Sequence, residues 1–306
     1  MSALICGSLA FDTITNFQGR FSQQILPDQV HILNVSFLVP TLRREFGGCA
    51  GNIAYTLHAM GGSPVVMAML GQDGGEYRAR LAGWGADTSL VGEHAREYTA
   101  QAIIITDEDN NQITAFHPGA MSQAHELALP TDGSRRDLGI GIIAPDGRAA
   151  MADHARQMHE AGIPFIFDPG QQLPQFDGAE HRHMLGMARW VAVNDYEARM
   201  LCERTGESLE QISRRANIDG VVVTLADQGC DVWVRGECTR APGVPATEVV
   251  DPTGCGDAFR AALLYGLERG WSLLRCAELG NRIGALKIAC RGGQNHVVDR
   301  AALGLV

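Results

Sequence analysis

The chain has 306 residues, 45% of them hydrophobic and 20% charged, which predicts one large globular core and argues against disorder. It has 35 acidic and 25 basic residues, and its formal charge is −10. With this charge and no cluster of Lys or Arg, we expect neither nucleic acid nor an anionic membrane as a partner. The N-terminus lacks the pattern of a signal peptide, and no apolar run could span a bilayer, so we expect a cytoplasmic protein.

The N-terminal segment predicts a strand followed by polar candidates. An apolar run at residues 3–6 indicates a buried strand, which ends at Gly7-Ser8. Asp12 follows shortly afterwards, and open α/β sheets bind ligands at the carboxyl ends of their strands. Ser8 and Asp12 are therefore candidate substrate contacts, with a surface turn as the alternative. Residues 13–39 are too irregular for one helix and predict an inserted lid that partly forms strands.

Two glycines precede the next predicted helix. Gly47-Gly48 leads through Asn52 into an apolar stripe of helical spacing. The amide of Asn52 can donate and accept hydrogen bonds at once, which suits a sugar hydroxyl. Ordinary packing of a helix against a sheet explains the glycines equally well. Further on, residues 98–106 and 112–116 predict a β-hairpin with one exposed face, which we expect to pair with the earlier lid strands.

From residue 138 the pattern becomes an alternation of strands and helices, which predicts a largely parallel sheet. Asp168 closes one predicted strand, and the amides of the following loop, up to Gln172, suit hydroxyl groups or a base edge. Asn194 and Glu197 lie three residues apart at a predicted helix start. Their oxygens could hold a hydrated Mg²⁺ on nucleotide phosphates. The alternative is a capping box that serves only the helix.

The most informative stretch is residues 251–259, Asp-Pro-Thr-Gly-Cys-Gly-Asp-Ala-Phe. It follows the β-branched run 247–250 and precedes a long apolar segment, so we expect a strand, a glycine turn and a helix start. Backbone N–H groups of the turn would converge on an anion; the turn consists of Gly254, Cys255 and Gly256. Asp257 beside that anion suggests a general base for phosphoryl transfer. The alternative is an Asp that only caps the helix.

Together these stretches resemble the ribokinase-like (PfkB) family of sugar and nucleoside kinases, and they occur in that family's order. Gly47-Gly48 with Asn52 resembles its substrate-binding motif, residues 194–197 match its N-x-x-E, and residues 251–257 resemble its D-T-x-G-A-G-D. The resemblance implies a three-layer α/β/α fold with a mainly parallel central sheet and a small β-sheet lid. It implies one domain, 1–306, with lid segments at about 12–46 and 96–120.

The resemblance also implies the cofactors. ATP would be the phosphoryl donor, Asp257 the catalytic base, and the turn before it the anion hole. Mg²⁺ would be held through water near Glu197, without a direct protein ligand set. The implied ATP and Mg²⁺ residues are Asn194, Glu197, Thr224, Gly229, Gly254 and Gly256. A monovalent cation, K⁺, would lie near Asp251 and the 291–296 loop.

Within the family, the chain is most similar to bacterial adenosine kinases, and the lid stretches 17–22, 35–38 and 116–121 carry much of that similarity. This implies phosphorylation of the ribose 5′-hydroxyl of adenosine to give AMP and ADP, a reaction of purine salvage. The implied ribose contacts are Ser8, Asp12, Gly48 and Asn52. The implied adenosine pocket consists of Ser36, Phe116, Met121 and Gln172.

One departure from these enzymes concerns the base. Ala102 stands where similar enzymes can carry an aromatic ring that stacks on the base, a loss of about 1–3 kcal/mol. A family kinase for another nucleoside or for a sugar is therefore the alternative. A non-catalytic ligand sensor on the same fold is a further alternative, against which the intact Asp257 argues. The apolar lid predicts a homodimer formed through the lid.

Overall fold

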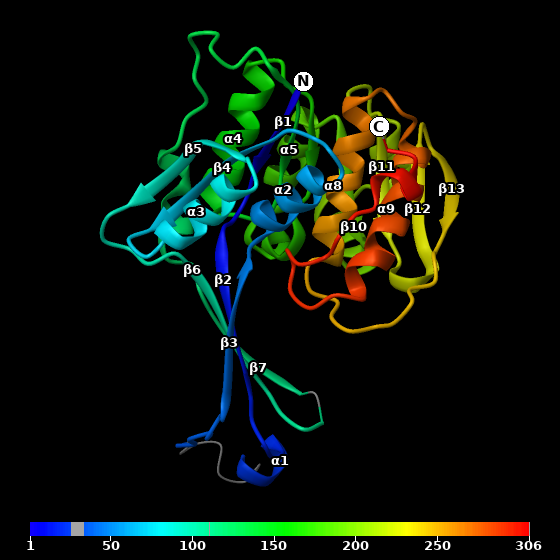
Figure 1. The fold of residues 1–306 in the computed structure, drawn as a ribbon. Helices are drawn as coiled ribbons and strands as arrows, with labels where there is room; N and C mark the ends of the chain where they lie inside the picture. The colour runs from blue at the N-terminus through cyan, green and yellow to red at the C-terminus, as the bar shows by residue number, and fades with distance from the viewer. Residues whose placement is uncertain (26–33, 110, 306) are drawn as a thin grey trace.

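The computed structural model describes residues 1–25, 34–109 and 111–305. The larger of the two sheets in this part consists of β1 (Ser2–Cys6), β4 (Pro64–Gly71), β5 (Asp87–His94), β8 (Leu138–Ile143), β9 (Phe165–Phe167), β10 (Trp190–Asn194), β11 (Gly220–Thr224), β12 (Gly229–Val234) and β13 (Glu237–Pro242). Its strand order is β13-β12-β11-β10-β9-β8-β1-β4-β5 (Figure 1). Neighbouring strands are parallel except for the pairs β11–β12 and β12–β13.

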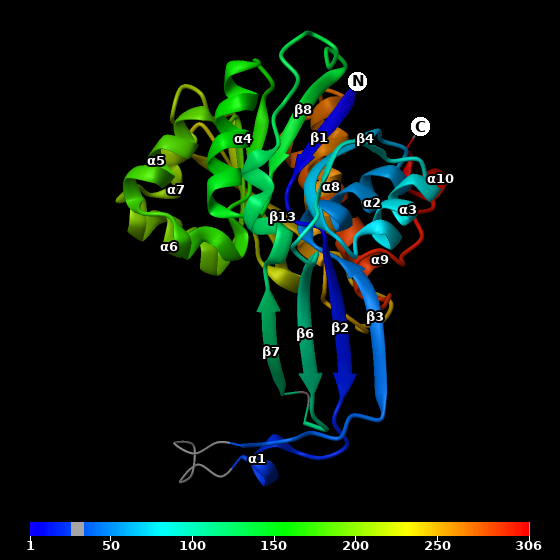
Figure 2. The same cartoon turned by 90° about the vertical axis from the view of Figure 1, so that its left-hand side faces the viewer.

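Helices cover both faces of this sheet (Figure 2). One face packs against α2 (Cys49–Ala59), α3 (Gly75–Gly83), α8 (Cys255–Glu268) and α9 (Leu273–Ile288). The other packs against α4 (Arg148–Glu160), α5 (Gly178–Met187), α6 (Asp195–Thr205) and α7 (Leu209–Ser213). Since side chains alternate along a strand, β1 sends Ala3 and Ile5 into the first core and Leu4 and Cys6 into the second. The expected three-layer α/β/α class is confirmed.

The smaller sheet forms the lid, and it extends away from the main body (Figures 1 and 2). Its strands are β2 (Ala10–Asn16), β3 (Thr41–Gly47), β6 (Ala100–Thr106) and β7 (Gln112–His117), in the order β3-β2-β6-β7. As expected, β6 and β7 form an antiparallel hairpin, which joins the earlier strands through the parallel pair β2–β6. At the outer end, near α1 (Phe21–Gln24), the rings of Phe17, Phe21 and Phe37 pack with centroids 5.0–6.0 Å apart.

Short helical turns complete the described part of the chain. They are η2 (Gly119–Glu126), η3 (Gly170–Gln175), η4 (Ala226–Gln228) and α10 (Arg300–Leu303). Residues 26–33, which fall within the expected lid segment 12–46, lie outside the described residues. Among the helices that are described, none combines the length and apolar character needed to cross a bilayer.

One predicted strand is wrong. The β-branched run 247–250 forms no strand; it is a loop in which Val249 is 76% exposed. The edge position of the sheet is instead taken by β13, whose residues are mostly polar and exposed and therefore showed no apolar alternation. Strand propensity depends on a neighbouring strand and on a surface to pack against, and the run 247–250 has neither. The other edge strand, β5, was also not predicted, because its residues are mostly polar and show no apolar alternation either.

Candidate active site

A cavity of about 400 Å³ lies at the carboxyl ends of the central strands. β9, β10 and β11 end at this edge, and α2, α6 and α8 begin there. The structure thus brings together five predicted residues from two strand ends and two helix starts: Asn194, Glu197, Thr224, Gly256 and Asp257. The full lining is Cys49, Pro145, Asp168, Gly170, Gln171, Asn194, Asp195, Tyr196, Glu197, Thr224, Ala226, Gly256, Asp257 and Arg260.

The turn before α8 presents free backbone N–H groups. Gly254 precedes the helix with φ +77°, a left-handed conformation that favours glycine. The N–H of Cys255 donates to the carbonyl of Pro252 at 3.1 Å. Within the described part of the chain, the N–H groups of Gly256 and Asp257 have no acceptor. These groups and the helix dipole make the start of α8 a place for an anion.

Asp257 uses its carboxylate outside its own helix. Oδ2 accepts a hydrogen bond of 2.8 Å from Nδ2 of Asn52, and no side chain caps α8. The alternative that Asp257 only caps the helix therefore does not hold. Burial raises its pKa to about 6, aided by Asp168, whereas the bond from Asn52 and the charge of Arg260 lower it. A carboxyl with this pKa is mostly ionised at neutral pH and can take up a proton.

Asn52 belongs to a buried network that sequence reasoning missed. Nε2 of Gln294 donates to Oδ1 of Asn52 at 3.3 Å and contacts the hydroxyl of Tyr77 at 2.7 Å. Arg80 donates to Oε1 of Gln294 at 3.2 Å. Because arginine can only donate, it fixes which end of Gln294 faces Asn52, and so turns Nδ2 of Asn52 toward Asp257. No local pattern marks these residues, since Gln294 and Asn52 lie 242 positions apart.

The lid contributes a second carboxylate. Asp12 lies within β2 rather than in a loop after β1, and it pairs with Glu45 on β3 and Ala102 on β6. Ala102 pairs in turn with Phe116 on β7, so these side chains share one face of the lid. Burial raises the pKa of Asp12 to about 6, with further contributions from the negative charges of Asp257, Asp251 and Glu45.

Ser8 and Gly48 meet where the lid joins the body. Oγ of Ser8 accepts a hydrogen bond of 3.1 Å from the N–H of Cys49. Gly48 has φ +83°, and a Cβ there would lie 2.6 Å from both the nitrogen of Ala10 and the carbonyl oxygen of Ser8. The glycine is therefore required by close approach of backbone to backbone, whatever it contributes to substrate binding.

The remaining predicted residues are not all beside Asp257. Met121 is 5% exposed and packs with Ala10 and Ala100 at the base of the lid. Gln172 is half-buried in η3, where its neighbour Gln171 lines the cavity instead. Ser36 is exposed in the segment before β3, at the outer end of the lid, and Gly229 begins β12 outside the cavity lining.

Asn194 and Glu197 form a capping box at the start of α6. The side chain of each accepts a hydrogen bond of 2.8 Å from the backbone N–H of the other. Glu197 also lies 3.9 Å from Nη2 of Arg260. The capping box is therefore present, and the carboxylate of Glu197 also lines the cavity. In the part of the chain that is described, no three His, Cys, Asp or Glu side chains gather as a metal cluster.

Arg260 is a buried ion-pair partner rather than a surface one. It is 5% exposed, and Nε and Nη2 donate to the two carboxylate oxygens of Asp168 at 3.0 and 3.2 Å. This two-point contact ties α8 to the loop after β9. Arg260 also lines the cavity.

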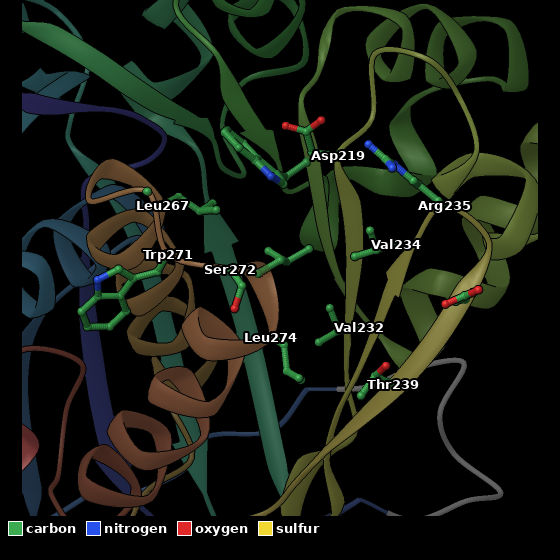
Figure 3. Close-up of a pocket in the computed structure, with 13 residues that line it drawn as sticks. Asp219, Val232, Val234, Arg235, Thr239, Leu267, Trp271, Ser272 and Leu274 are labelled. Carbon is green, nitrogen blue, oxygen red and sulfur yellow. The ribbon is translucent and has the colours of Figure 1, made fainter.

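A second cavity, of about 700 Å³, lies away from this site (Figure 3). Trp190 and Asp219 line it at the opposite ends of the strands that carry Asn194 and Thr224. Trp271 and Ser272, in the connection between α8 and α9, form another wall. Because α8 begins at the active site and ends here, the length of a helix separates the two cavities.

A carboxylate facing free N–H groups suits the transfer of a phosphoryl group to a hydroxyl. Fold and site together therefore define the class, an α/β kinase with a β-sheet lid. Over residues 19–300 the sequence matches the family described as pfkB family carbohydrate kinase, and the chain belongs to that family. The family expected from the motifs is confirmed.

Several proteins of known name are similar to the chain. A structure of the Burkholderia thailandensis nucleoside kinase in complex with inosine is 46% identical, with a TM-score of 0.86 over 98% of this chain and 95% of the other. The nucleoside kinase structure from Methanocaldococcus jannaschii is 25% identical, with a TM-score of 0.89 over 99% and 97%. The nucleoside kinase of Methanothermobacter thermautotrophicus is 26% identical over 300 residues, which are 97% of this chain and 92% of the relative.

Proposed function

We propose that the chain is an ATP-dependent nucleoside kinase that phosphorylates the ribose 5′-hydroxyl of adenosine, giving AMP and ADP. The observation that carries this proposal is the carboxylate of Asp257, held by Asn52 beside the free N–H groups at the start of α8. Asp12 faces the same place from the lid, where a ribose hydroxyl would offer it a hydrogen bond.

The reaction needs one proton acceptor and one anion site. Asp257 takes the proton of the 5′-hydroxyl as the ribose oxygen forms a bond to the γ-phosphorus of ATP. The bond from that phosphorus to the bridging oxygen of ADP breaks at the same time. The N–H groups of Gly256 and Asp257 stabilise the charge on the transferred group. Closure of the lid excludes water and so suppresses hydrolysis of ATP.

ATP with Mg²⁺ would occupy the cavity at the strand ends. Glu197, Asn194 and Thr224 present oxygen atoms there, and Mg²⁺ prefers oxygen ligands and keeps several waters. When bound, Mg²⁺ neutralises phosphate charge. Glu197 would hold it through water, because one carboxylate oxygen already serves the N–H of Asn194. Gly254 and Gly256 would approach the phosphates through the backbone, and Gly229 would lie at the far end of the nucleotide.

The choice of nucleobase is the less constrained part of the proposal. Phe116 is 52% exposed on the lid face that carries Asp12, but the neighbouring position, Ala102, offers no second ring. Inosine in the Burkholderia thailandensis structure supports purine nucleosides as a group. Another structure of that enzyme is described as a complex with ADP-inosine, which supports a nucleotide donor. A kinase for inosine or another nucleoside is therefore the second candidate.

The test is an ADP-release assay over adenosine, inosine, guanosine, cytidine, ribose and fructose 6-phosphate, with Asp257→Asn as the background control. We expect adenosine to give the highest kcat/KM, inosine and guanosine to follow, and ribose to be poor. If a free sugar is preferred, the nucleoside assignment is overturned. If no acceptor supports ADP release above the control, the kinase assignment itself fails.

The lid supports the further proposal of a homodimer. Leu42, Ile103 and Ile113 lie on the lid face opposite to Asp12 and are 68%, 44% and 40% exposed. An apolar face of this kind on a small sheet is typical of a covered surface. Sedimentation of the wild type and of Ile103→Lys tests the proposal: we expect a dimer and a monomer, respectively, whereas a monomeric wild type would contradict it.

A further inference from the structure

The chain contains a single lysine, Lys287, and all its other basic side chains apart from histidine are arginines. This lysine lies in the last turn of α9, and its side chain is 0% exposed. Lysine is among the residues least often fully buried, because removing an ammonium group from water is costly. The one side-chain ammonium group of the chain is therefore buried away from solvent.

The ammonium group joins two backbone segments of the active site. Nζ donates to the carbonyl oxygen of Asp251 at 2.8 Å and to that of Cys290 at 2.9 Å. Asp251 begins the turn that leads to the anion site and Asp257. Cys290 precedes the 291–296 loop, which carries Gln294 and thereby reaches Asn52. One charged atom thus holds both halves of the catalytic arrangement.

Neighbouring contacts reinforce the same junction. The carboxylate of Asp251 accepts hydrogen bonds from the N–H of Gly292 at 2.8 Å and from the N–H of Thr253 at 2.9 Å. Asp251 is 9% exposed, so its negative charge lies in the same buried region as Nζ and offsets the cost of burying it. Burial raises the pKa of the Cys255 thiol, and the positive charge of Lys287 opposes that rise. The positive charge of Lys287 therefore acts on a group within the 251–257 turn.

This is the region in which the resemblance implies a K⁺ ion, near Asp251 and the 291–296 loop. K⁺ takes backbone carbonyl oxygens as ligands. The carbonyls of Asp251 and Cys290 already accept hydrogen bonds from Nζ, and a K⁺ shared between them would lie at contact distance from a like charge. The residues present therefore do not fit a K⁺ ion at these carbonyls.

We propose that the ammonium group of Lys287 replaces the monovalent cation, so that the enzyme needs no K⁺. Being part of the chain, it ties the 251–257 turn to the 290–296 loop permanently and supplies positive charge behind the anion site. This proposal rests on the proposed kinase function only for its activity measurements.

The first experiment uses the wild type and needs no variant. Initial rates of ADP release are compared in KCl, NaCl and tetramethylammonium chloride at equal ionic strength. We expect equal rates in all three salts, because the ammonium group of Lys287 already occupies the cation site. Activation by K⁺ of about tenfold, the effect of one charged hydrogen bond, would overturn the proposal.

The second experiment removes the ammonium group and leaves space for an ion. Lys287→Ala is expected to lose about tenfold or more of kcat in tetramethylammonium chloride and to regain most of it in KCl. The matched control is Arg282→Ala on the same helix, which removes an exposed cation that donates to the carbonyl of Ala302 at 3.2 Å. The control should show no K⁺ response. Full activity of Lys287→Ala without K⁺ would refute the proposal.

A third measurement is independent of activity. With ¹⁵N-lysine labelling, the single lysine gives a single Nζ signal. We expect a charged ammonium signal protected from exchange and unchanged by KCl. A neutral amine signal, or a shift on addition of K⁺, would contradict the proposal. If no nucleoside is phosphorylated but this signal appears as expected, the proposed function is wrong, whereas the proposal that Lys287 replaces the cation is supported. If Lys287→Ala does not fold, the wild-type salt series and this signal still decide.

Discussion

At the scale of single residues, the proposed reaction depends on the ionisation of Asp257. A general base must be unprotonated, and burial raises the pKa of Asp257 to about 6. Asp12 also has a pKa of about 6, raised by its own burial and then by Asp257. The charge of Asp257 thus contributes to the raised pKa of Asp12, and we expect both carboxyls to affect the pH profile.

We therefore predict that kcat/KM falls as the pH is lowered through about 6 and levels off above it. In Asn52→Leu the carboxylate of Asp257 loses the hydrogen bond that lowers its pKa. The acid limb of the pH profile, in which kcat/KM falls with falling pH, should therefore move to higher pH. The measurement is kcat/KM for adenosine from pH 5 to pH 9. A limb that stays in place in Asn52→Leu would show that Asn52 does not tune the base.

Gln294 contacts the proposed general base, Asp257, through Asn52. Gln294→Leu leaves Oδ1 of Asn52 without its donor, at a cost of about 1–3 kcal/mol in unfolding free energy. Tyr77 still donates to the carbonyl of Gly47, and Arg80 still donates to the backbone carbonyl of residue 294. Since Asn52 is then free to turn away from Asp257, we expect kcat to fall more than KM rises, with the acid limb shifted upward. Thermal unfolding and pH-dependent kinetics measure the two effects.

The neighbouring residue provides the control. Asn295→Ala removes an exposed amide that contacts Glu45 and the carbonyl of Arg291 but not Asn52. It should leave the acid limb where it is. If both variants shift the limb equally, the effect comes from the loop as a whole and not from the orientation of Asn52.

At the scale of elements, the register of the lid determines which side chains share a face with Asp12. Asp12, Ala102 and Phe116 form one row across β2, β6 and β7. A slip of one residue would turn all three to the opposite face, because side chains alternate along a strand. The register of the lid therefore places the proposed ribose contact and the proposed nucleobase contact on one face together.

We predict that Ala102→Phe lowers KM for purine nucleosides by about 5- to 160-fold, since a ring beside Phe116 adds about 1–3 kcal/mol of stacking. KM for ribose should not change. Ala115→Phe places the same ring on the opposite lid face, where Ala115 pairs with Ile103, and serves as the control. Equal effects of the two substitutions would show that added apolar area, and not stacking in the row, is responsible.

At the scale of the whole molecule, buried ionisable groups link stability to pH. Asp146 is 2% exposed; Oδ1 accepts a hydrogen bond from the N–H of Gly147, whereas Oδ2 has no partner among the described residues. Burial raises its pKa to about 8, from the usual 3.8. A carboxyl whose pKa is raised on folding stabilises the fold below the lower value and loses that contribution as the pH rises through the higher one.

His296 changes stability in the opposite direction. Burial and the charge of Lys287 lower its pKa to about 4, from 6.5, so its contribution is lost as the pH falls from 6.5 to 4. Of these two groups, only Asp146 changes stability between pH 6.5 and pH 8. We therefore expect the unfolding free energy to fall across that range.

Asp146→Asn should abolish most of that fall, which amounts to about 1.4 kcal/mol for each unit of pKa shift titrated. Chemical denaturation at pH 6.5 and pH 8 measures it. Asp153→Asn, which removes an exposed carboxylate of α4, should retain the wild-type slope. An unchanged slope in Asp146→Asn would mean that another group carries the pH dependence.

The sequence by itself determined the elements with strong local patterns. Apolar runs predicted most central strands, and glycines before helices predicted the turns at Gly48 and Gly254, because a left-handed backbone is a local requirement. The order of the motifs predicted the family, and the site residues at strand ends followed from the rule that parallel strands end at one edge.

Only the tertiary structure decided what depends on contacts between distant segments. The edge strands β5 and β13 and the loop at 247–250 reflect neighbouring strands and not local propensity. The network from Gln294 to Asn52 spans 242 positions, and the contact of Lys287 with Asp251 spans 36. A buried hydrogen bond of this kind leaves no periodic trace in the sequence, because its partners meet only when the sheet and its helices have assembled.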